Sequence, residues 1–148
     1  MKMLIAYDGT LQSKDALRFG LAKAKETGAR VAILSVFDTE AFVDYEISPN
    51  QMETARKQSA ARLDEARVIV KTEGAGVDVG IYTAEGDPEA QTLEFALHEG
   101  VDFLLCTKKY GGIVNQYKSA LEARGKGETC SIVHDATGRV AATCAKAA

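Results

Sequence analysis

The chain alternates between two hydrophobic periods, and this alternation limits its possible folds more than any other feature. Short apolar runs end at turn residues, as residues 3–7 do at Asp8-Gly9, and segments with apolar residues at helical spacing follow them. Short apolar runs are typical of buried strands, and spacings of three and four are typical of helices. A chain in which strands alternate with helices favours parallel strand pairs joined by right-handed crossovers.

The predicted elements follow one another without a linker that would divide the chain. Strands are predicted over residues 3–7, 31–37, 77–83, 101–107 and 130–133, and helices over 13–27, 51–73, 88–99 and 114–124. This pattern predicts an α/β fold, a three-layer sandwich with a five-stranded parallel sheet. We expect one domain over residues 1–135. Residues 136–148 are expected to form a C-terminal tail or an extra edge strand.

Composition and charge exclude several classes of protein. The 18 Lys and Arg residues against 21 Asp and Glu residues give a formal net charge of −3, which lacks the basic field of a nucleic-acid-binding protein. No apolar run approaches the ~18 residues of a membrane span, and the first apolar run is too short for a signal peptide. Three cysteines without a CxxC pair fit a reducing compartment. We therefore expect a cytoplasmic protein with no nucleic-acid or membrane partner.

Asp8 follows the first predicted strand, at the place where open parallel sheets bind ligands. Such ligands lie beyond the carboxyl ends of the strands, where the strand order reverses. If the first strand is central, that point lies between it and the fourth strand. A carboxylate there can accept hydrogen bonds from an adenine amine or a ribose hydroxyl, or help to hold a divalent metal beside phosphates. Alternatively, Asp8-Gly9 simply makes the turn.

A polar, glycine-containing segment follows the fourth predicted strand: Thr107, Lys108, Lys109, Tyr110, Gly111 and Gly112. Glycines let a phosphate approach backbone N–H groups, the next helix adds partial positive charge, and the lysines add full charges. The segment matches neither the GxxxxGK[ST] nor the GxGxxG motif, so an ordinary turn is the alternative. Cys106 is expected in the core, although its position next to this segment leaves a ligand contact open. No catalytic constellation stands out in the sequence.

Five pieces of the sequence occur together in a characteristic order: MLIAYDGT, GARVAILSVFD, EGDPE, VDFLLCT and CSIVHD. In their order and spacing, over about residues 2–135, the chain resembles the universal stress protein family. The resemblance implies a parallel five-stranded sheet of order 3-2-1-4-5 and a homodimer. In one branch of that family, ATP binds between the first and fourth strands.

The resemblance also implies a set of nucleotide-binding residues at the ends of the first, second and fourth strands and beyond: Ala6, Tyr7, Asp8, Val36, Phe37, Cys106, Thr107, Lys108, Gly111, Gly112 and Ser119. The family holds phosphates on a Gly-x-x-Gly segment, and this chain has Thr107 and Tyr110 in place of the two glycines. Two interpretations stay open. Either the phosphate site is lost, as in a branch that does not bind ATP, or Lys108 and Lys109 replace the backbone donors with point charges.

These observations predict a stress-response or regulatory module, a binder of ATP, alone or with Mg²⁺, rather than an efficient enzyme. An adenine-nucleotide hydrolase or transferase of a related α/β class is one alternative, suggested by Asp8 and the lysine pair. A protein-interaction module that uses an exposed strand edge is another.

Overall fold

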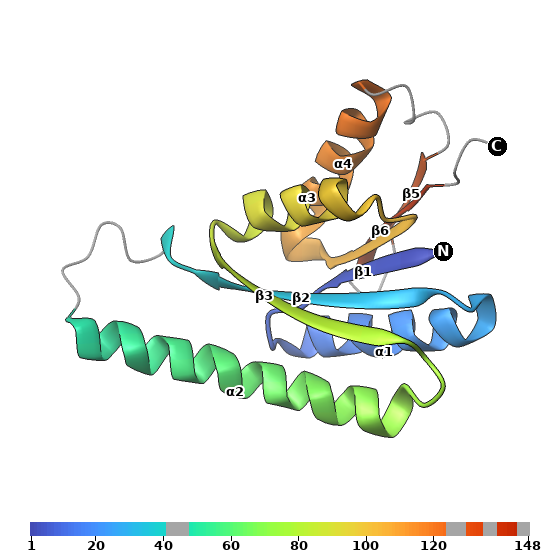
Figure 1. The fold of residues 1–148 in the computed structure, drawn as a ribbon. Coiled ribbons are helices and arrows are strands. Elements are labelled where there is room, and N and C mark those ends of the chain that lie inside the picture. The colour runs from blue at the N-terminus through green and yellow to red at the C-terminus, as the bar shows by residue number, and fades with distance from the viewer. Residues whose placement is uncertain (41–47, 124–129, 135–138, 145–148) are drawn as a thin grey trace.

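The computed structural model describes residues 1–40, 48–123, 130–134 and 139–144. Six strands form one sheet, and helices cover both of its faces (Figure 1). The strands are β1 (Lys2–Ala6), β2 (Arg30–Asp38), β3 (Val79–Gly86), β4 (Phe103–Thr107), β5 (Cys130–His134) and β6 (Arg139–Cys144). The helices are α1 (Leu11–Thr27), α2 (Pro49–Glu73), α3 (Pro88–Glu99), the short 3-10 helix η2 (Lys108–Tyr110) and α4 (Gly111–Ala123).

The strand order in the sheet is β3-β2-β1-β4-β6-β5. The pairs β1–β2, β1–β4 and β2–β3 are parallel, with Leu4 of β1 opposite both Ala32 and Leu104. The α/β class and the order 3-2-1-4 of the parallel strands are therefore confirmed. Because β1 is central, the strand order reverses between β1 and β4, and their carboxyl ends define the expected ligand position.

The predicted sheet of five parallel strands is wrong beyond β4. Strand β6 lies between β4 and β5 and is antiparallel to both, with Leu105 opposite Ala141 and Val133 opposite Ala141 on the other side. The segment expected as a tail or an edge strand is thus an inner strand. Residues 135–138 are too few for a crossover between parallel strands, which needs a dozen or more residues, so β5 and β6 pair as antiparallel neighbours.

The core is divided into two layers by the sheet. One layer joins Met3, Ile5 and Ile33 of the sheet to α1 and α2, and the other joins Leu4 and Leu104 to α3 and α4. Side chains alternate between the two faces along each strand, so consecutive apolar residues of β1 fill both layers. In Figure 1, α1 and α2 lie on one side of the sheet and α3 and α4 on the other. The apolar runs of β1 and β4 are thus confirmed as buried strands.

Helix α1 begins after the N-cap Thr10, and Leu17, Leu21 and Ala24 lie on its buried side. Gly20 lies on the same side of the helix, and a Cβ atom there would lie 2.5 Å from the Cδ1 atom of Ile5. The absence of a side chain therefore lets α1 approach β1 closely. The close packing fixes where α1 begins relative to the end of β1.

Helix α2 is long but only partly packed on the sheet. It begins with a capping box, in which Ser48 and Gln51 exchange side-chain-to-backbone hydrogen bonds. Its buried residues are Leu63, Ala66 and Ile69, all in the C-terminal half. The N-terminal half extends past the end of the sheet (Figure 1). Its inner side therefore lines a cleft instead of a core.

Candidate functional site

A cleft of about 560 Å³ lies at the carboxyl ends of the central strands. The turn after β1 forms its floor with Asp8 and Thr10, and the end of β2 contributes Ser35 to Asp38. Helix α2 forms one wall, while Pro88, Lys109 and Tyr110 contribute from the other face of the sheet. Residues after β1 and after β4 thus share one cleft at the point where the strand order reverses.

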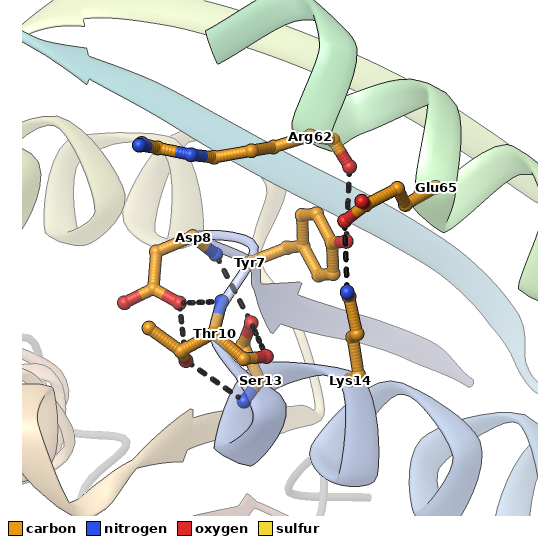
Figure 2. Close-up of polar contacts among 7 residues, drawn as sticks. All are labelled: Tyr7, Asp8, Thr10, Ser13, Lys14, Arg62 and Glu65. Atoms are coloured by element: carbon orange, nitrogen blue, oxygen red, sulfur yellow. Dashed lines mark hydrogen bonds and ion pairs between the residues drawn. The ribbon is translucent and has the colours of Figure 1, made fainter. Parts of the chain in front are cut away.

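Asp8 is fixed by the residues that begin α1 (Figure 2). Its Oδ1 atom accepts hydrogen bonds from the backbone N–H of Thr10 at 3.0 Å and from the Thr10 hydroxyl at 2.6 Å. The Thr10 Oγ1 atom in turn accepts a hydrogen bond from the backbone N–H of Ser13. Both hydrogen bonds from Thr10 end at Oδ1, and Asp8 lines the cleft.

The carboxyl group of Asp8 is held in its ionised form. Partial burial alone would raise its pKa, but hydrogen bonds from Thr10 and Ser13 and the positive charge of Lys109 outweigh burial and lower it. The influence of Lys109 shows that the charges on the two rims of the cleft interact. An ionised carboxylate is an acceptor only, so the ligand group opposite Asp8 must be a donor.

Tyr7 connects the end of β1 to α2. Its hydroxyl donates a hydrogen bond to the main-chain carbonyl of Arg62 at 3.0 Å (Figure 2). Burial, with smaller contributions from the Glu65 and Asp8 carboxylates, raises the pKa of Tyr7 to about 12, so the hydroxyl keeps its proton. The neighbouring Gly9 has a φ of 82°, in the left-handed region that favours glycine. A Cβ atom there would lie 2.7 Å from Cδ of Arg62, so the turn and α2 are in close contact.

Three of the residues implied by the resemblance line the cleft: Asp8, Val36 and Phe37. Ala6 and Tyr7 line a hollow of about 20 Å³ beside it, too small for more than a water molecule. Cys106 is fully buried in the layer under α3 and α4, and burial raises the pKa of its thiol to about 12.

The residues expected to hold phosphates are only partly brought to the cleft. Thr107 is buried, and its Oγ1 atom has no hydrogen-bond partner among the described residues. Lys108 is exposed and outside the cleft lining, whereas its neighbour Lys109 lines it. Gly111 and Gly112 begin α4, and Ser119 is exposed further along that helix; none of the three is in the lining.

Several lining residues were not predicted, and Arg62 is the main one. It lies on the exposed side of α2, next to the buried Leu63. Nothing in the sequence distinguishes it from Arg56 and Arg67 on the same helix. Tyr110 forms part of the cleft wall, with the Lys109 Nζ atom 5.3 Å from its ring centroid.

Among the described residues, no group of three or more His, Cys, Asp or Glu side chains is arranged to hold a metal ion. The two carboxylates of the cleft, Asp8 and Asp38, are therefore not part of a larger acidic cluster there. None of the helices in the described ranges is long and apolar enough to cross a membrane.

The sequence matches the model of the universal stress protein family over residues 1–116. The chain belongs to the universal stress protein family. The match includes β1 to β4 and therefore every residue that lines the cleft. No match is found among proteins with curated descriptions.

Solved structures of universal stress proteins have the same fold. One from Burkholderia pseudomallei is 21% identical, with a TM-score of 0.63 over 83% of this chain and 89% of that one. Another, in complex with cAMP, is 21% identical, with a TM-score of 0.53 over 70% of this chain and 69% of that one. The protein UspA from Lactobacillus plantarum is 17% identical, with a TM-score of 0.53 over 72% and 75% of the two chains.

Proposed function

We propose that this universal stress protein is a regulatory module that binds an adenine nucleotide in the cleft between β1 and β4. The observation that carries the proposal is that Asp8 and Lys109 line one cleft at the point where the strand order reverses. Its volume of about 560 Å³ falls within the ~300–1,000 Å³ that is usual for small-ligand sites.

The polar groups of the cleft suit a ligand with two different ends. Asp8 and Asp38, at the ends of β1 and β2, can accept hydrogen bonds from amines and hydroxyls, which a base and a ribose supply. Lys109, beyond β4, can attract an anion. A nucleotide carries donors at one end and phosphate at the other, so it fits this division. The universal stress protein solved in complex with cAMP supports an adenine nucleotide as the ligand class.

Binding without efficient turnover is the form of the proposal that the cleft supports. The described lining contains no His or Cys, and its polar groups are carboxylates, hydroxyls, amides and cations. General acid–base catalysis near neutral pH usually relies on a His or on a carboxyl with a raised pKa, whereas the pKa of Asp8 is lowered. Mg²⁺, where it takes part, would arrive with the ligand phosphates, as is usual for this ion.

Calorimetry with ATP, AMP and GTP tests the nucleotide proposal. Asp8→Asn is the informative variant, because the amide oxygen can still accept from Thr10 while an NH2 group, a donor, replaces the second carboxylate oxygen. We expect a loss of about tenfold or more in ATP affinity, the size of a hydrogen bond to a charged group. Asp15→Asn, on the exposed side of α1, is the matched control. Absence of binding heat for every nucleotide at millimolar concentration would eliminate the proposal.

The regulatory role is proposed together with a homodimeric, cytoplasmic protein. Regulation by ligand requires that the nucleotide changes the assembly or the surface that a partner meets. Sedimentation velocity with and without ATP measures the first of these directly. A monomer at high concentration in both conditions would contradict the dimer while leaving nucleotide binding intact.

A further inference from the structure

We propose that Arg62 of α2 is a phosphate-binding residue that acts with Lys109 across the cleft, so that two side-chain cations hold the phosphate. The inference rests on the proposed function and names the part of the ligand that α2 recognises. Arg62 and Lys109 line the same cleft but come from elements on different faces of the sheet, α2 and η2.

Among the residues that the structure describes, Arg62 differs from the other arginines of α2 in having no acidic partner. Arg56 pairs with Glu85 at 3.0 Å, and Arg67 pairs with Asp64 at 2.6 Å. Both paired arginines line a neighbouring hollow of about 520 Å³ between α2 and the ends of β2 and β3. Among the described residues, no carboxylate lies within ion-pair distance of Arg62. The α2 arginine in the Asp8 cleft is thus the one whose charge is not neutralised by a described neighbour.

The backbone of α2 at Arg62 is held against the turn that carries Asp8. The Tyr7 hydroxyl binds the Arg62 carbonyl at 3.0 Å, and Lys14 of α1 pairs with Glu65 at 2.8 Å. Gly9 leaves room for the aliphatic part of the Arg62 side chain, which lies within 3 Å of the position of a Cβ atom there. Three contacts around one turn of α2 therefore fix the position from which the Arg62 side chain extends.

Figure 2 shows the result of these contacts. The Arg62 side chain extends from α2 across the turn after β1, and its guanidinium lies on the same side as the Asp8 carboxylate in this view. A guanidinium presents up to five N–H donors in a planar fork that matches phosphate oxygens. Lys109 adds a point charge near Asp8, where it already lowers the pKa of that group. A phosphate between the two would be contacted from both walls.

The residues at and after the end of β4 explain why side-chain cations would hold the phosphate. Thr107 is buried at the end of β4, Tyr110 forms part of the cleft wall, and η2 with α4 follows directly. A side chain at either position limits how closely a phosphate can approach the main chain. Side-chain cations that reach into the cleft from a distance avoid this limit. The ligand class that follows is a phosphorylated nucleoside, in preference to the bare nucleoside.

The test compares adenosine, ATP and pyrophosphate on the full chain by calorimetry, with Arg62→Gln as the variant. We expect Arg62→Gln to weaken ATP and pyrophosphate by about tenfold and to leave adenosine within about twofold. Lys57→Gln, which removes one positive charge from an exposed position of α2 outside the cleft, should leave all three unchanged. Arg62→Lys should recover part of the loss, because it restores the charge without the fork.

The outcomes separate this inference from the proposed function. If the wild type binds ATP and Arg62→Gln binds it equally well, or loses adenosine and ATP equally, the inference is overturned and nucleotide binding stands. If the wild type binds pyrophosphate in an Arg62-dependent manner but no adenosine, the inference holds and the nucleoside part of the proposal fails. If the wild type binds none of the three, both are overturned.

Discussion

The hydroxyl of Tyr7, at the end of the central strand, donates a 3.0 Å hydrogen bond to the main-chain carbonyl of Arg62 on α2. This bond joins the floor of the cleft to its wall, because Asp8 follows Tyr7 in the chain and Arg62 lines the wall formed by α2. The buried phenol of Tyr7 is therefore one of the contacts that position α2 relative to the ligand.

Tyr7→Phe should loosen this connection without emptying the core. Loss of one hydrogen bond should lower the free energy of unfolding by about 0.5–1.5 kcal/mol, measured by urea denaturation. If Tyr7 positions Arg62, the affinity for ATP should fall by about two- to fivefold while that for adenosine stays constant. An equal fall for both ligands would assign Tyr7 a purely structural role.

The two adjacent lysines should behave differently. Lys109 lines the cleft and its charge reaches Asp8, whereas Lys108 is exposed outside the lining. Lys109→Gln should therefore weaken ATP binding by about tenfold, while Lys108→Gln should change it by less than about twofold. Equal effects of the two substitutions would mean that a general positive field, and not a contact in the cleft, attracts the nucleotide.

Asp8 should contribute to stability at neutral pH and lose that contribution in acid. Its pKa is lower in the folded protein than in the unfolded chain, so the ionised form favours folding. The stabilisation is complete above the unfolded-state pKa of about 4 and is lost as the pH falls through the folded-state pKa. Urea denaturation of the wild type and Asp8→Asn from pH 7 to pH 3 measures this difference. A difference that grows towards pH 3 would contradict the direction.

Gly20→Ala should destabilise the protein although it adds a good helix former. The new methyl group would lie 2.5 Å from Cδ1 of Ile5, and such overpacking costs about 1–3 kcal/mol against a gain in helix propensity of about 1 kcal/mol. Gly112→Ala is the control, because a Cβ atom at that position of α4 meets nothing within 4 Å. The melting temperature, measured by thermal denaturation, should decrease for Gly20→Ala and should not decrease for Gly112→Ala.

Local patterns predicted most of the secondary structure because their causes are local. Asp87, Pro88 and Gly100 mark both ends of α3, where the side chain of Asp87 caps the Ala90 N–H and Gly100 adopts the left-handed conformation. The placement of β6 has no such local cause. It depends on pairing Arg139–Thr143 with β4, about 35 residues earlier in the chain, and sequence periodicity does not report such pairing.

The site was predictable where it follows from strand ends and unpredictable where it depends on the angle of a helix. Asp8 could be placed because a central parallel strand delivers its next residue to the ligand edge. Arg62 could not, because its position depends on where α2 leaves the sheet. For the same reason, the sequence does not show which of Lys108 and Lys109 lines the cleft, because the path of η2 determines which side chain reaches it.

Because β6 lies between β4 and β5, it joins the outermost strand, β5, to the strand whose end lies beside the cleft. Within the described residues, β5 pairs with β6 and with no other strand, and β6 alone connects it to β4. Removal of Arg139–Cys144 would therefore take away the pairing partner of both β4 and β5. Strand β5 would lose its place in the sheet, and β4, whose end leads into Lys109, would become an exposed edge strand.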